Sequence, residues 1–141
     1  MLLVKTMLKP SKIHGIGVFA AQNIRKGTVV WKFNPAIDKK FSEDEIALFP
    51  EVARKQVIHY SYRDAKGQMV LCGDDARFFN HSDSPSCNDP DEETTIATRD
   101  IKEGEELTSN YLTFDHGFVE KIREINGGGK GEILLFHFIY R

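Results

Sequence analysis

The amino-acid sequence predicts a mainly β fold with a small helical insert, and three observations lead to this prediction. Short runs rich in β-branched and aromatic residues recur along the chain, as at 28–33 and 94–98. Glycine-containing turns separate these runs, and helical patterns are few. The chain has 141 residues, of which 40% are hydrophobic and 28% charged. We therefore expect one domain over 1–141 with a core of its own.

The first third of the chain is typical of strands joined by turns. The segment 2–8 is expected to be the first strand, closed by Pro10 and Ser11. The turn Gly15-Ile16-Gly17 then leads through a short apolar run toward the strand at 28–33, and its glycines suit a close approach of backbone to a ligand. The segments 23–27 and 100–104 share a polar-Ile-charged-charged-Gly pattern. We interpret them as two similar hairpin turns.

The clearest helical signal in the first half lies at 42–58. Ser42 followed by Glu45 is a capping-box pattern, which favours a helix start, and Pro50 interrupts the insert before a second helical stretch. Two short strands, 60–62 and 68–72, are then expected to flank a turn.

The end of the chain predicts one more helix and one more strand. Phe118, Ile122 and Ile125 share a helical face, and the glycine run 127–129 ends that helix. The last run, 132–140, is apolar on both faces, so something should cover both of them. We expect its own domain, a bound peptide or a second copy in a homodimer to do so.

Composition excludes several classes of protein. A net charge of −2 with scattered basic residues gives no case for a nucleic-acid binder. Cys72 and Cys87 are too few for a disulfide scaffold or a cysteine-rich zinc cluster, and the histidines lack paired ligand spacing, so no metal is expected. No export signal or membrane span is recognisable. We expect a soluble intracellular protein.

Three motifs occur in order along the chain: Gly15-Ile16-Gly17, then Ala76-Arg77-Phe78-Phe79-Asn80-His81-Ser82 continuing to Cys87 and Asn88, then Glu105-Glu106-Leu107-Thr108-Ser109-Asn110-Tyr111. Together they resemble the pattern of the SET-domain protein lysine methyltransferases, a G-x-G, an R-F-x-N-H-S and an E-L-x-x-D-Y at similar spacing. Each motif is weak alone, but the ordered set spans most of the chain. The resemblance implies a fold of several small curled sheets in which the segments at Asn80 and Tyr111 meet in a knot-like arrangement.

The resemblance also implies an activity, methyl transfer from S-adenosylmethionine to the ε-amine of a lysine in a protein or peptide. Tyr111 takes the position of the catalytic tyrosine. Because phenols have a pKa near 10, we expect its hydroxyl to orient the amine and stabilise moving charge rather than act as a base. The alternative for Tyr111 is an ordinary buried tyrosine.

Further roles follow from the resemblance position by position. The cofactor-binding residues would be Gly15, Ile16, Gly17, Arg77, Phe78, Asn80, His81 and Tyr111. Asn80 would offer its side-chain amide to the methionine part and His81 its backbone near the adenine, whereas a structural role is favoured for Arg77. The lysine channel would be lined by Tyr60, Tyr62, Ser109 and Phe114. The alternatives are a tight turn for the glycines, a hydrogen-bonded turn for Asn80 and His81, and core positions for the aromatic residues.

The sequence departs from the family pattern at several positions. Ser109 stands where Phe or Tyr is usual, which leaves the number of methyl groups open, and Asn110 stands where Asp is usual. Asp83 and Ser86 replace the first Cys and the Asn of the family's second motif, and no cysteine cluster follows Tyr111, so no structural zinc is expected. The segment 115–141 would then supply the lid.

Two other functions stay open. One is a catalytically degenerate module that binds peptide or cofactor without turnover, and the other is methylation of something other than a protein lysine. The acidic run 89–93 lacks the pattern of a calcium loop. We interpret it as a solvated turn, with the alternative that it steers a lysine-rich peptide toward the site.

Overall fold

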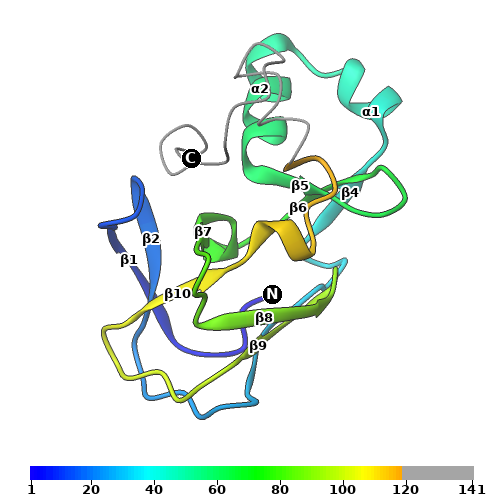
Figure 1. The fold of residues 1–141 in the computed structure, drawn as a ribbon. Coiled ribbons are helices and arrows are strands. Elements are labelled where there is room, and N and C mark those ends of the chain that lie inside the picture. Colours follow the sequence, from blue (N-terminus) through cyan, green and yellow to red (C-terminus); the bar gives the residue numbers. More distant parts are fainter. Residues whose placement is uncertain (119–141) are drawn as a thin grey trace, which may run out of the picture.

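The computed structural model describes residues 1–118, which form three small sheets with short helical elements between them. The largest sheet has the order β1 (Thr6–Pro10), β2 (Ile16–Ala20), β10 (Glu106–Ser109) and β7 (Asn80–His81). β1 and β10 run antiparallel to β2, whereas β7 runs parallel to β10 (Figure 1). The predicted mainly β class with several small sheets is confirmed.

Two three-stranded antiparallel sheets complete this architecture. One has the order β3 (Val29–Lys32), β9 (Thr94–Ala97) and β8 (Cys87–Asp91). The other has the order β4 (Lys39–Phe41), β6 (Met69–Leu71) and β5 (Ser61–Arg63).

β8 corrects the sequence analysis, which interpreted 89–93 as a solvated turn. Asp and Pro are depleted in strands, so Asp89, Pro90 and Asp91 gave no strand signal. The register of β8 against β9 shifts between Asn88 and Asp91. Such a bulge is one of the few places in a sheet where a proline is tolerated, because the ladder is interrupted there.

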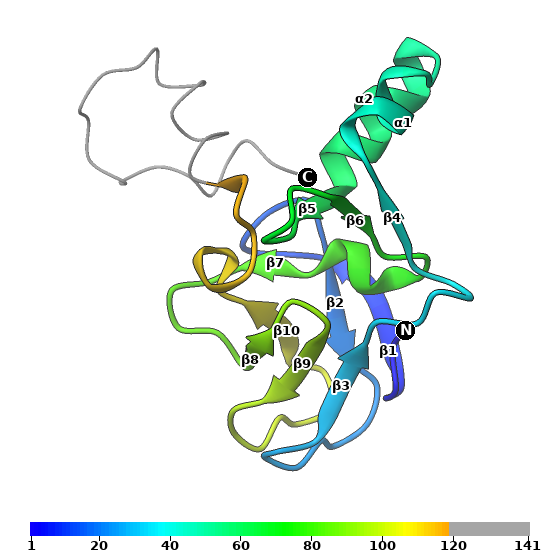
Figure 2. The same ribbon diagram turned by 90° about the vertical axis from the view of Figure 1, so that its right-hand side faces the viewer.

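The helical insert consists of α1 (Glu43–Ala47) and α2 (Glu51–Tyr60), close to the predicted 42–58. The Ser42 Oγ accepts from the Glu45 backbone N–H at 3.2 Å, and the Glu45 carboxylate accepts from the Ser42 N–H at 2.7 Å, which completes the predicted capping box. Both helices stand away from the sheets (Figure 2). Consistent with this, α2 has no buried residue.

The two turns at 23–27 and 100–104 are not hairpins, and that interpretation is wrong. The first joins β2 to β3 and the second joins β9 to β10, and in both cases the two strands belong to different sheets. The turns pair with each other instead. Ile24 and Ile101 exchange backbone N–H to C=O bonds, both of 2.8 Å.

The first strand begins later than predicted. β1 starts at Thr6 and includes Pro10, while Leu2 forms an isolated bridge with Trp31. Pro10 is accommodated because β1 lies at the edge of its sheet, where a missing N–H leaves no partner unsatisfied.

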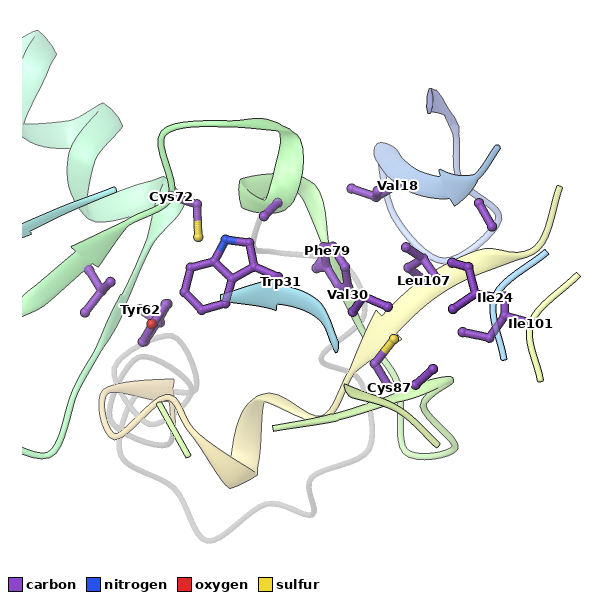
Figure 3. Close-up of a cluster of buried hydrophobic side chains, with 14 residues drawn as sticks. Val18, Ile24, Val30, Trp31, Tyr62, Cys72, Phe79, Cys87, Ile101 and Leu107 are labelled. Atoms are coloured by element: carbon purple, nitrogen blue, oxygen red, sulfur yellow. The ribbon is translucent and has the colours of Figure 1, made fainter. Parts of the chain in front are cut away.

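The core lies between the four-stranded sheet and the β3-β9-β8 sheet. Figure 3 shows Trp31 near Tyr62 and Cys72 at one end of this cluster, with Ile24 and Ile101 at the other end. Val18, Val30 and Leu107 are fully buried between them. This core fixes β2, β3 and β10, the strands from which the candidate site extends.

Several predictions fall outside the described residues. They are the helix beyond Phe118, the strand at 132–140, most of the lid segment 115–141 and the homodimer through the C-terminal apolar run. Among residues 1–118, no helix is long and apolar enough to cross a membrane.

Candidate active site

The second and third motifs meet through β7 and β10. Thr108 pairs with Asn80 and Ser109 with His81 in the parallel ladder. Beyond β10, the Tyr111 backbone N–H donates to His81 Nδ1 at 3.1 Å, and the Tyr111 hydroxyl donates to the Phe79 carbonyl oxygen. The tyrosine and the Asn-His pair, 30 residues apart in sequence, are thereby held together.

Asn110 ends the strand and begins the 3₁₀ turn Tyr111–Thr113. Its side-chain Oδ1 accepts from the Leu112 N–H at 3.0 Å, as a helix-capping residue does. Asn and Asp cap helices about equally well, so the departure from the family's Asp keeps this local structure.

Asn80 fastens the glycine turn to β7. Asn80 is only 2% exposed. Its side-chain nitrogen donates to the His14 carbonyl at 3.1 Å and to Glu106 Oε1 at 2.8 Å. An amide NH₂ has two hydrogens, so these bonds use both donors. If the predicted contact of this amide with a cofactor used its nitrogen, it would have to displace one of them.

The first motif is shaped by its two glycines. Gly15 has a φ of 46°, in the left-handed region that favours glycine. A Cβ at Gly17 would lie 2.1 Å from Glu106 Oε1, so the absence of a side chain there lets the Glu106 carboxylate approach. Glu106 Oε2 in turn accepts from the Ser11 hydroxyl at 2.9 Å, which ties the start of the turn to β10.

Tyr111 lies beside a cavity of about 40 Å³, enough for a few water-sized groups. All four residues predicted for the lysine channel line it together with Tyr111: Tyr60, Tyr62, Ser109 and Phe114. The Phe114 ring lies edge-on to Tyr62 at 5.1 Å and to Tyr111 at 5.6 Å between centroids. The cavity therefore has aromatic walls, which attract a cationic head group on an apolar chain.

The tyrosines of the cavity differ in their hydrogen bonds. The Tyr62 hydroxyl donates to the Glu92 carbonyl oxygen, and burial, with smaller effects of nearby negative groups, raises the pKa of Tyr62 far above its usual value. Tyr62 is thus a neutral phenol at any physiological pH. Tyr60 packs edge-on against Phe78 at 5.6 Å instead.

Arg77 lines the cavity next to Tyr60. Its guanidinium donates to the Cys72 carbonyl oxygen at 2.9 Å and lies over the Tyr60 ring at 5.9 Å. These contacts support the structural role favoured for Arg77. Phe78, by contrast, packs against the Tyr60 ring and is not among the residues that line the cavity.

Acidic residues also line the cavity, and the sequence analysis did not place them in the site. They are Asp89, Asp91 and Glu92. Burial raises the pKa of the Asp89 carboxyl to about 6, the negative charge of Asp91 acts in the same direction, and the Thr95 and Ser109 hydroxyls oppose the rise. The acidic run was visible in the sequence, but its place beside the cavity depends on the bulge in β8, which the sequence does not show.

The first residues of the segment predicted to be the lid contact residues of the site. The His116 N–H donates to the Arg63 carbonyl oxygen at 2.9 Å, and His116 Nε2 lies 2.8 Å from the Glu92 carboxylate. Phe118 packs against Tyr111 at 5.3 Å between centroids.

Cys87 is not among the residues that line the cavity. Burial raises the pKa of the Cys87 thiol to about 12, which keeps it an inert core residue. Among the described residues, no three His, Cys, Asp or Glu side chains gather into a group that would hold a metal ion.

Comparison with known proteins identifies the family. The SET-domain family pattern matches residues 15–112, which include all three motifs and the cavity residues up to Tyr111. The chain belongs to the SET-domain family. Its similarity to this family therefore rests on most of the described sequence as well as on the geometry of the site.

Curated relatives carry the name of one enzyme class. The human protein Histone-lysine N-methyltransferase 2D is 29% identical over 112 residues, which are 74% of this SET chain and 2% of the human protein. The Schizosaccharomyces pombe protein Histone-lysine N-methyltransferase, H3 lysine-4 specific, is 32% identical over 111 residues, 72% of this chain and 12% of the yeast protein. The chain thus spans a small fraction of these relatives.

Solved structures share the fold. A structure of the Chaetomium thermophilum Polycomb Repressive Complex 2 bound to the inhibitor GSK126 superimposes with a TM-score of 0.60 at 24% identity, over 86% of this chain and 17% of the matched chain. A ctPRC2 structure in an autoinhibited conformation bound to S-adenosylmethionine gives a TM-score of 0.59 at 22% identity, over 88% and 17% of the two chains.

Proposed function

We propose that this SET protein transfers methyl groups from S-adenosylmethionine to the ε-amine of a lysine in a protein substrate, a histone or another basic protein. The observation that carries the proposal is the cavity: Tyr111 and the four aromatic or polar residues predicted for the lysine channel line one space together with acidic groups. The names of the curated relatives support the same reaction class.

Tyr111 has the geometry to orient an amine. Because its O–H donates to the Phe79 carbonyl, the phenol oxygen acts as an acceptor toward an approaching N–H. The residue is 5% exposed and is held at its backbone by His81, so the oxygen is preorganised. A fixed acceptor beside the reacting nitrogen lowers the entropy lost in reaching the aligned geometry.

The glycine turn fits the cofactor. Gly15 and Ile16 are exposed, and the buried His14 Nδ1 has no hydrogen-bond partner among residues 1–118. The residues that would hold S-adenosylmethionine are Gly15, Ile16, Gly17, Asn80 and His81, together with Arg77, Phe78 and Tyr111. When bound, the cofactor supplies an electrophilic methyl group on a sulfonium. An intracellular location and a single domain over 1–141 stay predictions.

The proposal is tested by incubating the protein with S-adenosylmethionine that carries a labelled methyl group and with a panel of lysine-containing proteins. We expect mass spectrometry to find label on lysine, and Tyr111→Phe to reduce the transfer rate about a hundredfold or more, since it removes the positioned oxygen. Calorimetry of cofactor binding and circular dichroism serve as controls that the variant is folded.

Binding of cofactor without transfer to any acceptor would contradict the proposal and favour the degenerate binding module. That alternative is motivated by Ser109, which replaces a usual aromatic residue. A small-amine panel run beside the proteins separates lysine methylation from methylation of another amine.

A further inference from the structure

Asp89 occupies an unusual position in the sheet that borders the cavity. It lies where the register of β8 against β9 shifts, between the pairs Asn88–Ile96 and Asp91–Thr94. Pro90, which follows, has no N–H with which to restore the ladder. Bulges of this kind redirect a side chain, often beside an active site. Asp89 here lines the cavity together with Tyr62 and Tyr111.

The two carboxylate oxygens of Asp89 differ. Oδ1 accepts from the Thr95 hydroxyl at 2.6 Å, which fixes the orientation of the side chain. Oδ2 is buried and has no hydrogen-bond partner among residues 1–118, and the Ser109 hydroxyl, whose proximity lowers the pKa of the carboxyl, makes no hydrogen bond to it. A buried carboxylate oxygen without a donor is unfavourable, so a donor that enters the cavity gains a ready acceptor.

The charges around Asp89 favour a cation over an anion. Asp91 and Glu92 line the same cavity, and the one basic residue among 1–118 that lines it, Arg77, donates to the Cys72 carbonyl and lies over Tyr60. The rings of Tyr62 and Phe114 also form part of its walls. An ammonium group at the end of an apolar chain satisfies both features, the acceptor and the aromatic walls.

We propose that Asp89 is a specificity-determining residue that selects acceptor amines carrying N–H donors, by accepting a charge-assisted hydrogen bond from the incoming ammonium. This inference rests on the proposed function and adds a recognition step to it. A primary or partly methylated ammonium has an N–H for Oδ2, whereas a trimethylated one has none. Since a carboxylate stabilises the charged form of the amine, Asp89 acts in binding and does not remove the proton.

The direct test uses n-butylammonium and n-butyltrimethylammonium, two cations with the chain length of lysine, of which only the first has N–H donors. Both are titrated into the full chain by NMR. Because a hydrogen bond between charged groups corresponds to at least about a tenfold change in affinity, the wild type should prefer n-butylammonium by that factor. The preference should disappear in Asp89→Asn.

Asp91→Asn is the matched control, an exposed acid two residues further along the strand that also borders the cavity. Loss of its charge should weaken the binding of both cations by a similar factor and leave the ratio of the two affinities as in the wild type. An unchanged ratio in Asp89→Asn would overturn the inference, because the preference would then reflect the larger volume of the trimethylated head. Equal affinity of the wild type for the two cations would overturn it as well.

The titration needs no methyl transfer, so its outcome is separable from that of the proposed function. If the wild type prefers n-butylammonium and loses this preference in Asp89→Asn, but no lysine is labelled in the transfer assay, the proposed activity is contradicted and the role of Asp89 is supported. If lysine is labelled but the ratio of the two cation affinities is unchanged in Asp89→Asn, the activity is supported and the role of Asp89 is contradicted. Once a peptide substrate of the enzyme is identified, Asp89→Asn should raise the KM for that peptide about tenfold and change kcat little, as expected for a residue that acts in binding.

Discussion

At the scale of single residues, the Asp89 carboxyl makes the stability of the protein depend on pH. Its pKa is raised from 3.8 to about 6 in the folded state, mainly by burial. The folded protein therefore holds this proton more tightly than the unfolded chain does. The resulting stabilisation is fully present below about pH 4 and is lost as the pH rises through about 6.

Asp89→Asn should reveal this contribution. The amide is neutral at every pH and still accepts from Thr95, so the variant should be more stable than the wild type at pH 7, by at most about 3 kcal/mol for a shift of two pKa units. At pH 4 the two proteins should be nearly equal. Urea unfolding at both pH values measures the difference, and an equal difference at pH 4 and pH 7 would contradict the account.

Individual site residues were predictable to different degrees. Tyr111 and the channel residues Tyr62 and Phe114 were placed in the site by motif position and aromatic character, and one cavity brings them together. Asp89 was missed because an acidic run beside a proline has the composition of a solvated turn. The bulge that directs its side chain is a property of the pairing between β8 and β9, which no local pattern encodes.

At the scale of elements, the glycine turn and β10 depend on each other through Glu106. Gly17→Ala should destabilise the protein by about 2 kcal/mol, because a Cβ 2.1 Å from Glu106 Oε1 forces this carboxylate away from Asn80 and Ser11. Urea unfolding measures the free energy, and calorimetry should show weaker binding of S-adenosylmethionine as the turn shifts.

A double-mutant cycle tests this cause. In a Glu106→Ala background the alanine at position 17 has no carboxylate to displace, so its effect on the free energy of unfolding should fall below about 0.5 kcal/mol. An equal effect in both backgrounds would show that Gly17 matters for its backbone or for another neighbour, and would contradict the link to Glu106.

Elements with a local signal were predicted well, and those defined by distant pairing were not. The capping box at Ser42 and Glu45 marks the start of α1 through bonds within four residues, which a sequence carries in full. The two isoleucine turns have the composition of hairpins. The two turns, however, pair with each other through Ile24 and Ile101, which are 77 positions apart in the sequence.

At the scale of the whole molecule, composition and periodicity establish the mainly β class and no more. The parallel pairing of β7 with β10, through which Asn80 and Tyr111 meet, came from the resemblance to a family. The knot-like arrangement that the resemblance implies is rare, so pattern reasoning gives it little weight. The family match over residues 15–112 confirms that resemblance, and the site depends on it because the motifs supply residues from three distant segments.

The most direct test of the activity is a reaction run to completion with an excess of S-adenosylmethionine whose methyl group is trideuterated. Each peptide of a basic panel is made in three versions that differ only at one position, which holds lysine, Nε-acetyl-lysine or norleucine. We predict that label appears on the ε-amine of the lysine version alone, with a mass increment that gives the number of methyl groups allowed by Ser109. Label on the acetylated or norleucine peptides, or on none of the lysine peptides, would contradict the account.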